Sequence, residues 1–126
     1  MLGAAGLLQG YRAACHWTCL DQLTELGAEP MAERVVVDRD RITGARVTSG
    51  IDFALTLAAR IRGDDVAKEI QLGMEYDTDP PFATGSPKTA PDELVARQKE
   101  RLQAFSEKRL AATRKAAGAL VRDPAS

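Results

Sequence analysis

Apolar and polar residues follow one another along the chain in blocks whose spacing predicts a protein of mixed helices and strands. The first block, Met1 to Gln9, is apolar and small with no polar face, so it is expected to form a buried helix that ends at Gly10. Tyr11 to Cys15 follows as a short strand. Apolar residues then recur at helical spacing over Trp17 to Leu26, and Gly27 closes this helix.

The next block predicts a β-hairpin. Arg34 to Val37 and Arg41 to Val47 contain β-branched residues, and they flank turn residues at Asp38 to Asp40. Together with Tyr11 to Cys15 these arms give very little sheet for the number of apolar helices that the pattern predicts. We therefore expect further strands upstream of Met1.

The helix after the hairpin is expected to lie in the core. Ser49 has the residue type of an N-cap, and Asp52 stands three residues later, where a capping box carries its acidic member. A carboxylate that caps a helix N-terminus also suits the helix dipole. Gly50 to Arg62 is apolar around most of its circumference, which predicts a helix buried on most sides.

The last third of the chain changes from apolar to charged. Gly63 separates the core helix from a second helix that runs from Asp64 to about Tyr76. Thr78 to Pro91 is rich in proline and predicts an extended loop. Asp92 to about Val121 predicts one long charged helix. Its weak apolar stripe consists of Leu94, Leu102, Phe105 and Leu110.

Composition and charge restrict the class of protein. Hydrophobic residues make up 44% and charged residues 28% of the chain, and the formal net charge is −1, which is typical of a globular protein with no affinity for nucleic acid or anionic membranes. Glutamates interleave with the basic residues of the long helix, so we expect a solvated face there. Those basic residues are Arg97, Lys99, Arg101, Lys108, Arg109, Arg114 and Lys115. The apolar run of Met1 to Leu8 is too short to span a bilayer, and a cytoplasmic location is expected.

Candidate chemistry is concentrated around the only histidine. His16 lies between Cys15 and Cys19, but a zinc site needs four ligands and no second pair of ligands exists. Both cysteines are interpreted as small hydrophobes, Cys15 in a strand and Cys19 on a helix face. His16 has two interpretations, a cap of the following helix and a residue that lines a reactive site. Trp17 is expected in the core or an interface.

Three segments carry a resemblance to a known superfamily. The first, LGAAGLLQGYRAACHW, resembles the stretch after the nucleophile elbow of ThiJ/PfpI proteins, whose fold is that of class I glutamine amidotransferases. The second, RVVVDRDRITGARVTSGIDFALTLAARIRG, is similar to isonitrile hydratases and to the sensor domain of AraC-type regulators. The third, IQLGMEYDTDPPFATGSP, is closer to isonitrile hydratases. The resemblance covers residues 1–87, as the C-terminal part of such a domain, with residues 88–126 as a charged helical extension.

The resemblance implies an α/β fold, a partial flavodoxin-like three-layer sandwich lacking its N-terminal strands. It places a reactive cysteine in a Cys-Thr-Gly-like elbow about five residues upstream of Met1, so no catalytic residue is expected within this chain. His16, Cys15, Thr48 and Ser49 are the expected site-lining residues. The chain departs from the family at Ala45-Arg46, where small residues, often glycine, are usual, and Arg46 is expected to block or redirect the hairpin loop.

The function implied for the full-length form is hydration of an isonitrile to an N-substituted formamide. A cysteine thiolate would attack the isonitrile carbon, and water would release the product. The resemblance implies a small-molecule substrate, no metal or organic cofactor and, by analogy, a homodimer. The 126-residue chain is expected to be inactive. Two alternatives stay open: a sensor domain, which requires a helix-turn-helix after Pro91, and a non-catalytic remnant.

Overall fold

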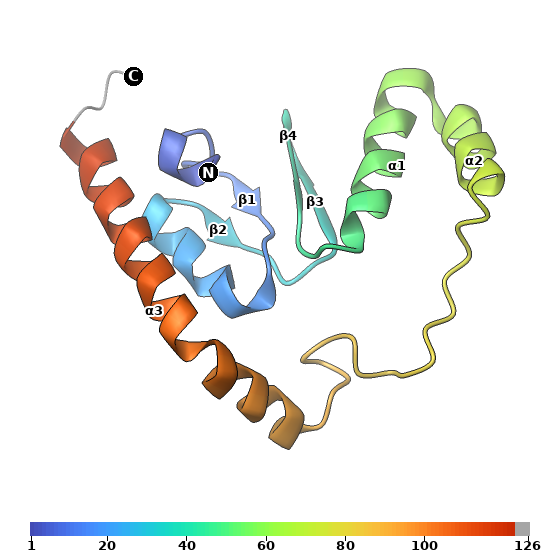
Figure 1. The fold of residues 1–126 in the computed structure, drawn as a ribbon. Coiled ribbons are helices and arrows are strands. Elements are labelled where there is room, and N and C mark those ends of the chain that lie inside the picture. Colours follow the sequence, from blue (N-terminus) through green and yellow to red (C-terminus); the bar gives the residue numbers. More distant parts are fainter. Residues whose placement is uncertain (123–126) are drawn as a thin grey trace.

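The computed structural model describes residues 1–122, and it places helices on both sides of two small sheets (Figure 1). The elements in chain order are η1 (Gly3–Ala5), β1 (Arg12–Ala13), η2 (Trp17–Leu26), β2 (Glu29–Pro30), β3 (Val35–Asp38), β4 (Arg41–Gly44), α1 (Ser49–Arg62), α2 (Asp64–Gly73) and α3 (Asp92–Arg122). The predicted order of helices and strands is therefore confirmed, with β2 as an addition.

The first sheet is a short parallel pair. β1 lies beside β2, with Arg12 opposite Glu29 and Ala13 opposite Pro30. The backbone N–H of Glu29 donates to the carbonyl of Tyr11 at 2.9 Å, and that of Met31 donates to Ala13 at 2.8 Å. Pro30 lies between these two donors. It has no N–H, but the pairing of β2 with β1 needs no hydrogen bond from this position. β2 was not predicted, because a Glu-Pro pair carries none of the residue preferences of a strand.

The second sheet is the predicted hairpin, with shorter arms. β3 and β4 pair antiparallel from Val35 opposite Gly44 to Asp38 opposite Arg41. Arg39 in the turn has a φ of 53°, which closes the two-residue connection. Side chains rather than ladder bonds join the two sheets: the Asp38 carboxylate accepts from the Arg12 N–H at 2.8 Å, and the Thr43 hydroxyl accepts from the Ala14 N–H at 2.9 Å.

The N-terminal block does not form the predicted buried helix. Only Gly3–Ala5 is helical, and Gly6 and Gly10 adopt left-handed φ angles of 74° and 68° that turn the chain. Glycine lowers helix stability and permits these angles, so its spacing here favours turns over a continuous helix. Leu8 is buried, whereas Met1, Leu2 and Leu7 are exposed.

Helix α1 is not the core helix that its composition predicts. Three of its large apolar side chains are exposed, Ile51 by 37%, Leu57 by 38% and Ile61 by 68%. Among the described elements, the hairpin and α2 are those that pack against α1. Helix α2 ends at Gly73 rather than near Tyr76, because the chain turns at Glu75 with a φ of 51°.

The long C-terminal helix is confirmed. α3 packs along η2 and reaches η1 (Figure 1). Leu94, Leu102 and Leu110 are half-buried, as the apolar stripe predicts. Phe105 was assigned to the same stripe, but it is 62% exposed. The extended loop between α2 and α3 is also as predicted.

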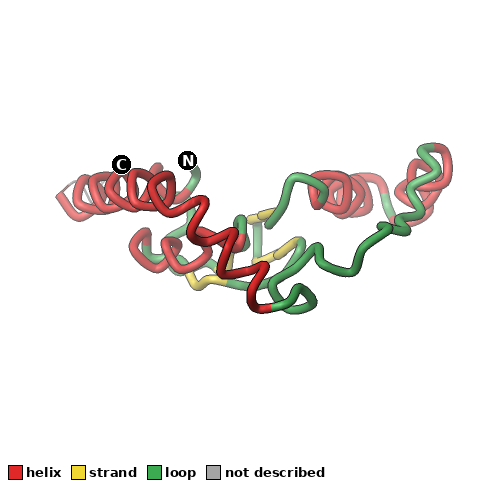
Figure 2. Tube along the Cα trace, turned by 60° about the horizontal axis from the view of Figure 1, so that its bottom comes forward, coloured by secondary structure: helices red, strands yellow, loops and turns green. Residues whose placement is uncertain are grey.

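The core consists of small residues in two separate clusters. Leu8, Ala13, Leu23 and Ala28 form one cluster, and Ala14, Val36 and Ala45 form the other. No large side chain among the described residues is buried beyond 98%, and the largest one buried to that extent is the small Ser49. The tube in Figure 2 shows a flat, extended molecule with α3 at one end and α1 and α2 at the other. Within residues 1–122, no helix is long and apolar enough to cross a membrane.

Candidate active site around His16

His16 lies at the junction between β1 and η2 and caps that helix. Its backbone is extended, with φ −57° and ψ 137°, and its ring nitrogen Nδ1 accepts a hydrogen bond from the Thr18 N–H at 3.3 Å. This satisfies one of the free donors of the first helical turn. The capping interpretation of His16 is therefore confirmed.

A chain of hydrogen bonds behind the ring determines its tautomer. Arg109 on α3 donates from Nη2 to the Thr18 hydroxyl at 3.2 Å and to the Thr18 carbonyl at 3.1 Å. The Thr18 hydroxyl hydrogen is then free to donate to His16 Nδ1, which is 2.9 Å from Oγ1. Because Nδ1 accepts from both groups, the neutral imidazole carries its proton on Nε2.

Partial burial and nearby positive charges keep that imidazole neutral. Partial burial, followed by the charges of Arg109 and Arg46, lowers the pKa of His16 below its usual value. At neutral pH the side chain is therefore an uncharged hydrogen-bond donor through Nε2. It is not placed to act as a base, because its only free lone pair is occupied by Thr18.

A pocket of about 400 Å³ opens beside the His16 ring. Its walls come from the start of η2, the proline-rich loop and the first turns of α3. The residues that line it are His16, Trp17, Thr84, Gly85, Ser86, Pro87, Ala90, Leu94, Val95, Gln98 and Leu102. Its size suits a small organic molecule. Trp17 was expected in the core or an interface; it is half-buried, lies outside both core clusters and forms part of this wall.

Arg46 connects the hairpin to the proline-rich loop. Its guanidinium donates from Nη1 to the Gly85 carbonyl at 2.6 Å and from Nη2 to the Ser86 hydroxyl at 3.0 Å. Gly85 and Ser86 line the His16 pocket, so Arg46 fixes one wall of it. The departure from the family at this position was expected to block or redirect the hairpin, and the structure shows instead an anchor for another loop.

Thr48 and Ser49 lie away from His16. The Ser49 hydroxyl accepts from the Arg46 N–H and donates to the Arg46 carbonyl, both at 2.7 Å. It therefore closes a local turn and is not the N-cap, a position that Thr48 occupies without a side-chain cap bond. Thr48 lines a different hollow of about 540 Å³ together with Arg34, Arg46 and Tyr76.

Asp52 is not a helix cap either. Its carboxylate forms an ion pair with Arg34, whose Nε lies 2.6 Å from Oδ2, and accepts from the Tyr76 hydroxyl at 2.9 Å. These bonds connect the first turn of α1 with the residue before β3 and with the segment after α2. Asp52 thus holds three parts of the chain together.

The two cysteines lie side by side behind His16. Their Sγ atoms are 3.5 Å apart, and both side chains are half-buried. Cys15 follows β1 rather than lying within it, and Cys19 lies on η2 as predicted. Cys15 lines a second pocket of about 260 Å³, which shares Trp17 and Ser86 with the His16 pocket.

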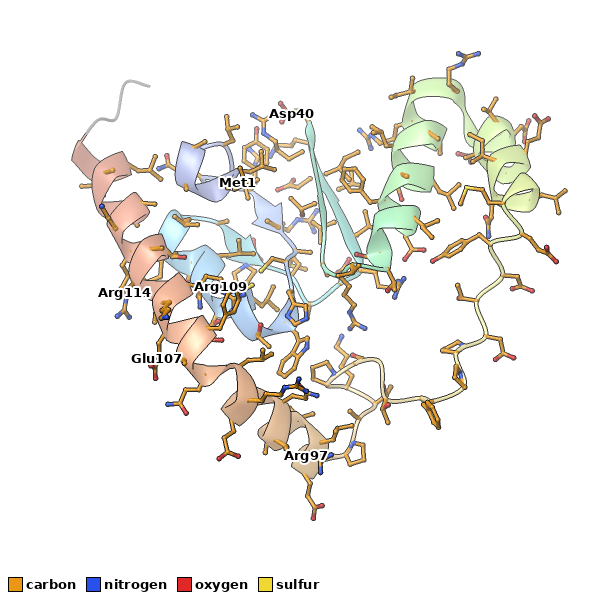
Figure 3. The ribbon with its side chains drawn as sticks, viewed as in Figure 1. Met1, Asp40, Arg97, Glu107, Arg109 and Arg114 are labelled. Carbon is orange, nitrogen blue, oxygen red and sulfur yellow. The ribbon has the colours of Figure 1, made fainter. Side chains whose placement is uncertain are left out.

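Arg109 is the site residue that sequence analysis missed. It was assigned to a solvated helix face, yet it is half-buried and extends from α3 to η2 (Figure 3). Its Nε is buried without a hydrogen-bond partner. No sequence signal separates it from the other basic residues of α3, because its role depends on how α3 packs.

Metal ligands do not gather anywhere in the described part of the chain. Among residues 1–122, no group of three or more His, Cys, Asp or Glu side chains is arranged to hold a metal ion.

Comparisons with known proteins agree with the resemblance. Residues 1–60 match the DJ-1/PfpI family. The chain is 48% identical to isonitrile hydratase of Pseudomonas putida over 120 residues, which are 95% of this chain and 53% of that protein. It is 38% identical over 68 residues to the HTH-type transcriptional regulator ArgR of Pseudomonas aeruginosa, a match that covers 52% of this chain and 21% of the regulator.

A solved structure shows the same fold. The crystal structure of a ThiJ/PfpI family protein from Pseudomonas syringae superposes with a TM-score of 0.84 at 49% identity, covering 93% of this chain and 47% of that one. The partial α/β, flavodoxin-like fold class is thereby confirmed. The chain spans about half the length of isonitrile hydratase and of this solved relative. By sequence and by fold, the chain is an isonitrile-hydratase-like relative of the DJ-1/PfpI, or ThiJ/PfpI, proteins.

Proposed function

We propose that this chain supplies the His16 wall of an isonitrile-hydratase-like active site, whose nucleophilic cysteine is contributed from outside residues 1–122. The observation that carries the proposal is the fixed Nε2–H of His16, at the edge of a pocket large enough for a small isonitrile. The reaction adds water to the isonitrile to give an N-substituted formamide, and it needs no metal or organic cofactor.

His16 acts in this proposal as a hydrogen-bond donor. An N–H aimed at a thiolate lowers its pKa, because it stabilises the charged form. The same donor stabilises negative charge that develops as the thiolate sulfur adds to the isonitrile carbon. Protonation of that carbon and attack by water then release the formamide and regenerate the thiolate. Trp17, Leu94 and Val95 provide an apolar wall for the organic substituent.

A chimera tests this proposal. In the chimera, this chain is inserted in place of the matching stretch of isonitrile hydratase of Pseudomonas putida. The assay follows the loss of a simple alkyl isonitrile and the formation of its formamide. We expect turnover by the chimera, and a loss of about 10²-fold on His16→Phe, which is the typical cost of removing one such donor. Lys68→Gln on the exposed face of α2 is the matched control and should leave turnover unchanged.

Two results would contradict the proposal. One is a folded chimera that does not turn over isonitrile, since the His16 wall would then be unsuited to the reaction. The other is turnover by the purified 126-residue chain that is lost on Cys15→Ala, since the nucleophile would then lie within the chain. We expect no turnover from the chain alone, because neither cysteine lines the pocket of His16.

The similarity to HTH-type regulators favours one alternative, a ligand-sensing module that binds a small molecule in the same pocket without turnover. Retention of ligand by an inactive but folded chimera would support it. A non-catalytic remnant would neither bind nor turn over the isonitrile. As part of the main proposal we place the protein in the cytoplasm, since both cysteines are free thiols, and assign it a small-molecule substrate and a homodimeric state.

A further inference from the structure

We propose that Cys15 and Cys19 form a redox-active dithiol, which a hydroperoxide converts reversibly into an intramolecular disulfide next to His16. This site is distinct from the proposed hydration chemistry, and it does not depend on it. The proposal stands on the distance between the sulfurs, on the charges around them and on the pocket that reaches them.

The two sulfurs are already in contact. Cys15 Sγ and Cys19 Sγ are 3.5 Å apart, so a disulfide requires them to approach by about 1.5 Å, to the S–S length of about 2.05 Å. Cys15 lies in the extended segment after β1, where its side chain can rotate without unwinding a helix. Cys19 Sγ also lies 3.2 Å from the His16 carbonyl, which places the dithiol directly behind the histidine.

The charges favour one thiolate, on Cys19. A hydrogen bond from the Cys15 thiol is the main reason that the pKa of Cys19 is lowered to about 6, and the Arg109 guanidinium acts in the same direction. The pKa of Cys15 is raised by the same hydrogen bond and by burial. The pair therefore holds a single negative charge at neutral pH, with Cys19 as the nucleophile and Cys15 as the resolving thiol.

The unpaired nitrogen of Arg109 is a second, independent sign of an anion at this place. Its Nε is buried without a hydrogen-bond partner, which is costly for a charged group unless a negative charge lies nearby. The side chain extends from α3 to the turn that carries the dithiol (Figure 3). A thiolate on Cys19 supplies the negative charge that this guanidinium faces.

A small oxidant has a path to Cys15, whose Sγ lies 3.5 Å from that of Cys19. The pocket of about 260 Å³ that Cys15 lines is open to solvent and carries three cationic side chains, Arg46, Lys88 and Lys99, with Glu33 as its one acidic residue. Its volume admits hydrogen peroxide or a short alkyl hydroperoxide but no large partner. We therefore assign the oxidant to the class of small hydroperoxides.

The chemistry balances with that oxidant. The Cys19 thiolate attacks the outer oxygen of the hydroperoxide, the O–O bond breaks, and the departing oxygen takes a proton to leave as water or an alcohol. The sulfur loses two electrons and becomes a sulfenic acid. The Cys15 sulfur then attacks it, the S–S bond forms, and the hydroxyl leaves with the Cys15 proton as water.

Disulfide formation removes the thiolate beside Arg109. Arg109 also donates to the Thr18 hydroxyl, which bonds to His16. A change in the oxidation state of the two cysteines should therefore change the environment of the His16 ring. His16 is the only histidine of the chain, so its ring protons report this coupling directly in an NMR spectrum.

The test is stoichiometric oxidation of the purified chain with hydrogen peroxide. Trypsin releases both cysteines on one peptide, residues 13–34, and we expect its mass to fall by two hydrogen atoms and to recover with dithiothreitol. In Cys15→Ser the sulfenic acid should accumulate on Cys19 and react with dimedone. In Cys19→Ser the remaining thiol should stay reduced. Circular dichroism verifies that each variant is folded.

A pH profile provides the readout that a merely structural pair would not give. In the native chain the rate of Cys19 alkylation should follow an apparent pKa near 6, and Cys15→Ala, which removes the hydrogen bond to Cys19, should raise that pKa. The chain unfolded in urea should show the ordinary value of about 8.5. Arg109→Met should slow oxidation several-fold, whereas Arg97→Met, at the far end of α3, should not (Figure 3).

Three results would overturn the proposal. These are oxidation of the folded chain no faster than of the unfolded chain, disulfides formed only between chains, and equal reactivity of Cys15 and Cys19 in the two single variants. An unchanged His16 spectrum on oxidation would overturn the coupling to the histidine.

Discussion

The chemistry of this chain depends on residues that are far apart in sequence and meet through one threonine. Arg109 and Thr18 are 91 positions apart, and their hydrogen bonds hold the Thr18 hydroxyl against His16 Nδ1. Two cations, Arg109 and Arg46, therefore act on one imidazole, the first through a hydrogen-bonded side chain and both through their charge. The result is a neutral histidine with a defined donor nitrogen.

An NMR titration of the single histidine checks this arrangement. The pKa of His16 should lie below the value of about 6.5 that is typical of an exposed histidine. Arg109→Met removes one of the nearby positive charges, so the protonated form becomes less unfavourable and the pKa of His16 should rise. Arg97→Met is the control with no expected change. A native pKa at or above that of the unfolded chain would contradict the assignment.

Sequence analysis found the His16 part of this network of residues. The capping role of His16 follows from its place before a helix, because a cap depends on local order alone. Arg46 was singled out only as a departure from the family, without its partners, and Arg109 was not found. A guanidinium within a charged helix or a hairpin is indistinguishable from a solvated one until the packing of α3 and of the proline-rich loop is known.

At the scale of elements, Asp52 connects three segments around α1. It lies in the first turn of α1 and bonds Arg34 before β3 and Tyr76 after α2. The hydrogen bond to Asp52 raises the pKa of Tyr76, so the phenol stays protonated and remains a donor. The contact therefore persists across the neutral range and holds α1, α2 and the hairpin as one unit.

Asp52→Asn should lower the free energy of unfolding by about 1 kcal/mol, because it removes the charge of a partly buried ion pair and weakens the bond to Tyr76. The Asp52 side chain is 27% exposed and that of Arg34 is 47% exposed, so solvent screening limits the effect. Asp65→Asn, whose ion pair with Lys68 is almost fully exposed, should change the stability much less. Urea unfolding measures both, and equal effects would refute the structural role of Asp52.

Arg46→Met should loosen the proline-rich loop without unfolding the chain. The substitution removes the bonds to Gly85 and Ser86, which leaves the loop with fewer contacts near Lys88. Trypsin should then cleave after Lys88 several-fold faster, since cleavage requires local opening. Arg60→Met on the exposed side of α1 is the control. An unchanged cleavage rate would show that other contacts hold the loop.

The elements themselves were predicted where local pattern decides them. The hairpin, η2 with its Gly27 end, and α3 all follow from spacing, turn residues and caps. The errors have identifiable physical causes. Glycines end the N-terminal helix early, and β2 forms through backbone pairing with β1 that a Glu-Pro sequence does not signal. The burial of α1 was overestimated. Composition shows that a helix has a large apolar surface, but it does not show whether other elements pack against that surface.

At the scale of the whole molecule, the chain exposes far more surface than a compact protein of its mass. Its accessible surface is 9080 Å², whereas a compact monomer of 13.6 kDa exposes about 6,600 Å². Helices α1 and α2 lie at the end of the molecule opposite α3 (Figure 2). The exposed large apolar residues there are Ile51, Leu57, Ile61, Ile70, Leu72 and Met74. The two core clusters are small and rich in alanine, and none of these side chains belongs to either of them.

This surface predicts self-association of the purified chain through α1 and α2. Burying a large aliphatic side chain is worth about 1.5–3 kcal/mol, so covering six of them gains roughly 10 kcal/mol, which is comparable to the free-energy cost of association. The balance is close, and one substitution should shift it. Ile61→Lys removes about 2 kcal/mol of that gain from each copy, so the dissociation constant should rise by at least roughly 30-fold. Val47→Lys alters a side chain that is 94% exposed outside this surface and should leave association unchanged. Sedimentation at several concentrations measures both variants. If the native chain instead sediments as a monomer at every concentration and melts in one cooperative transition, α1 and α2 need no covering partner, and the apolar surface does not drive association.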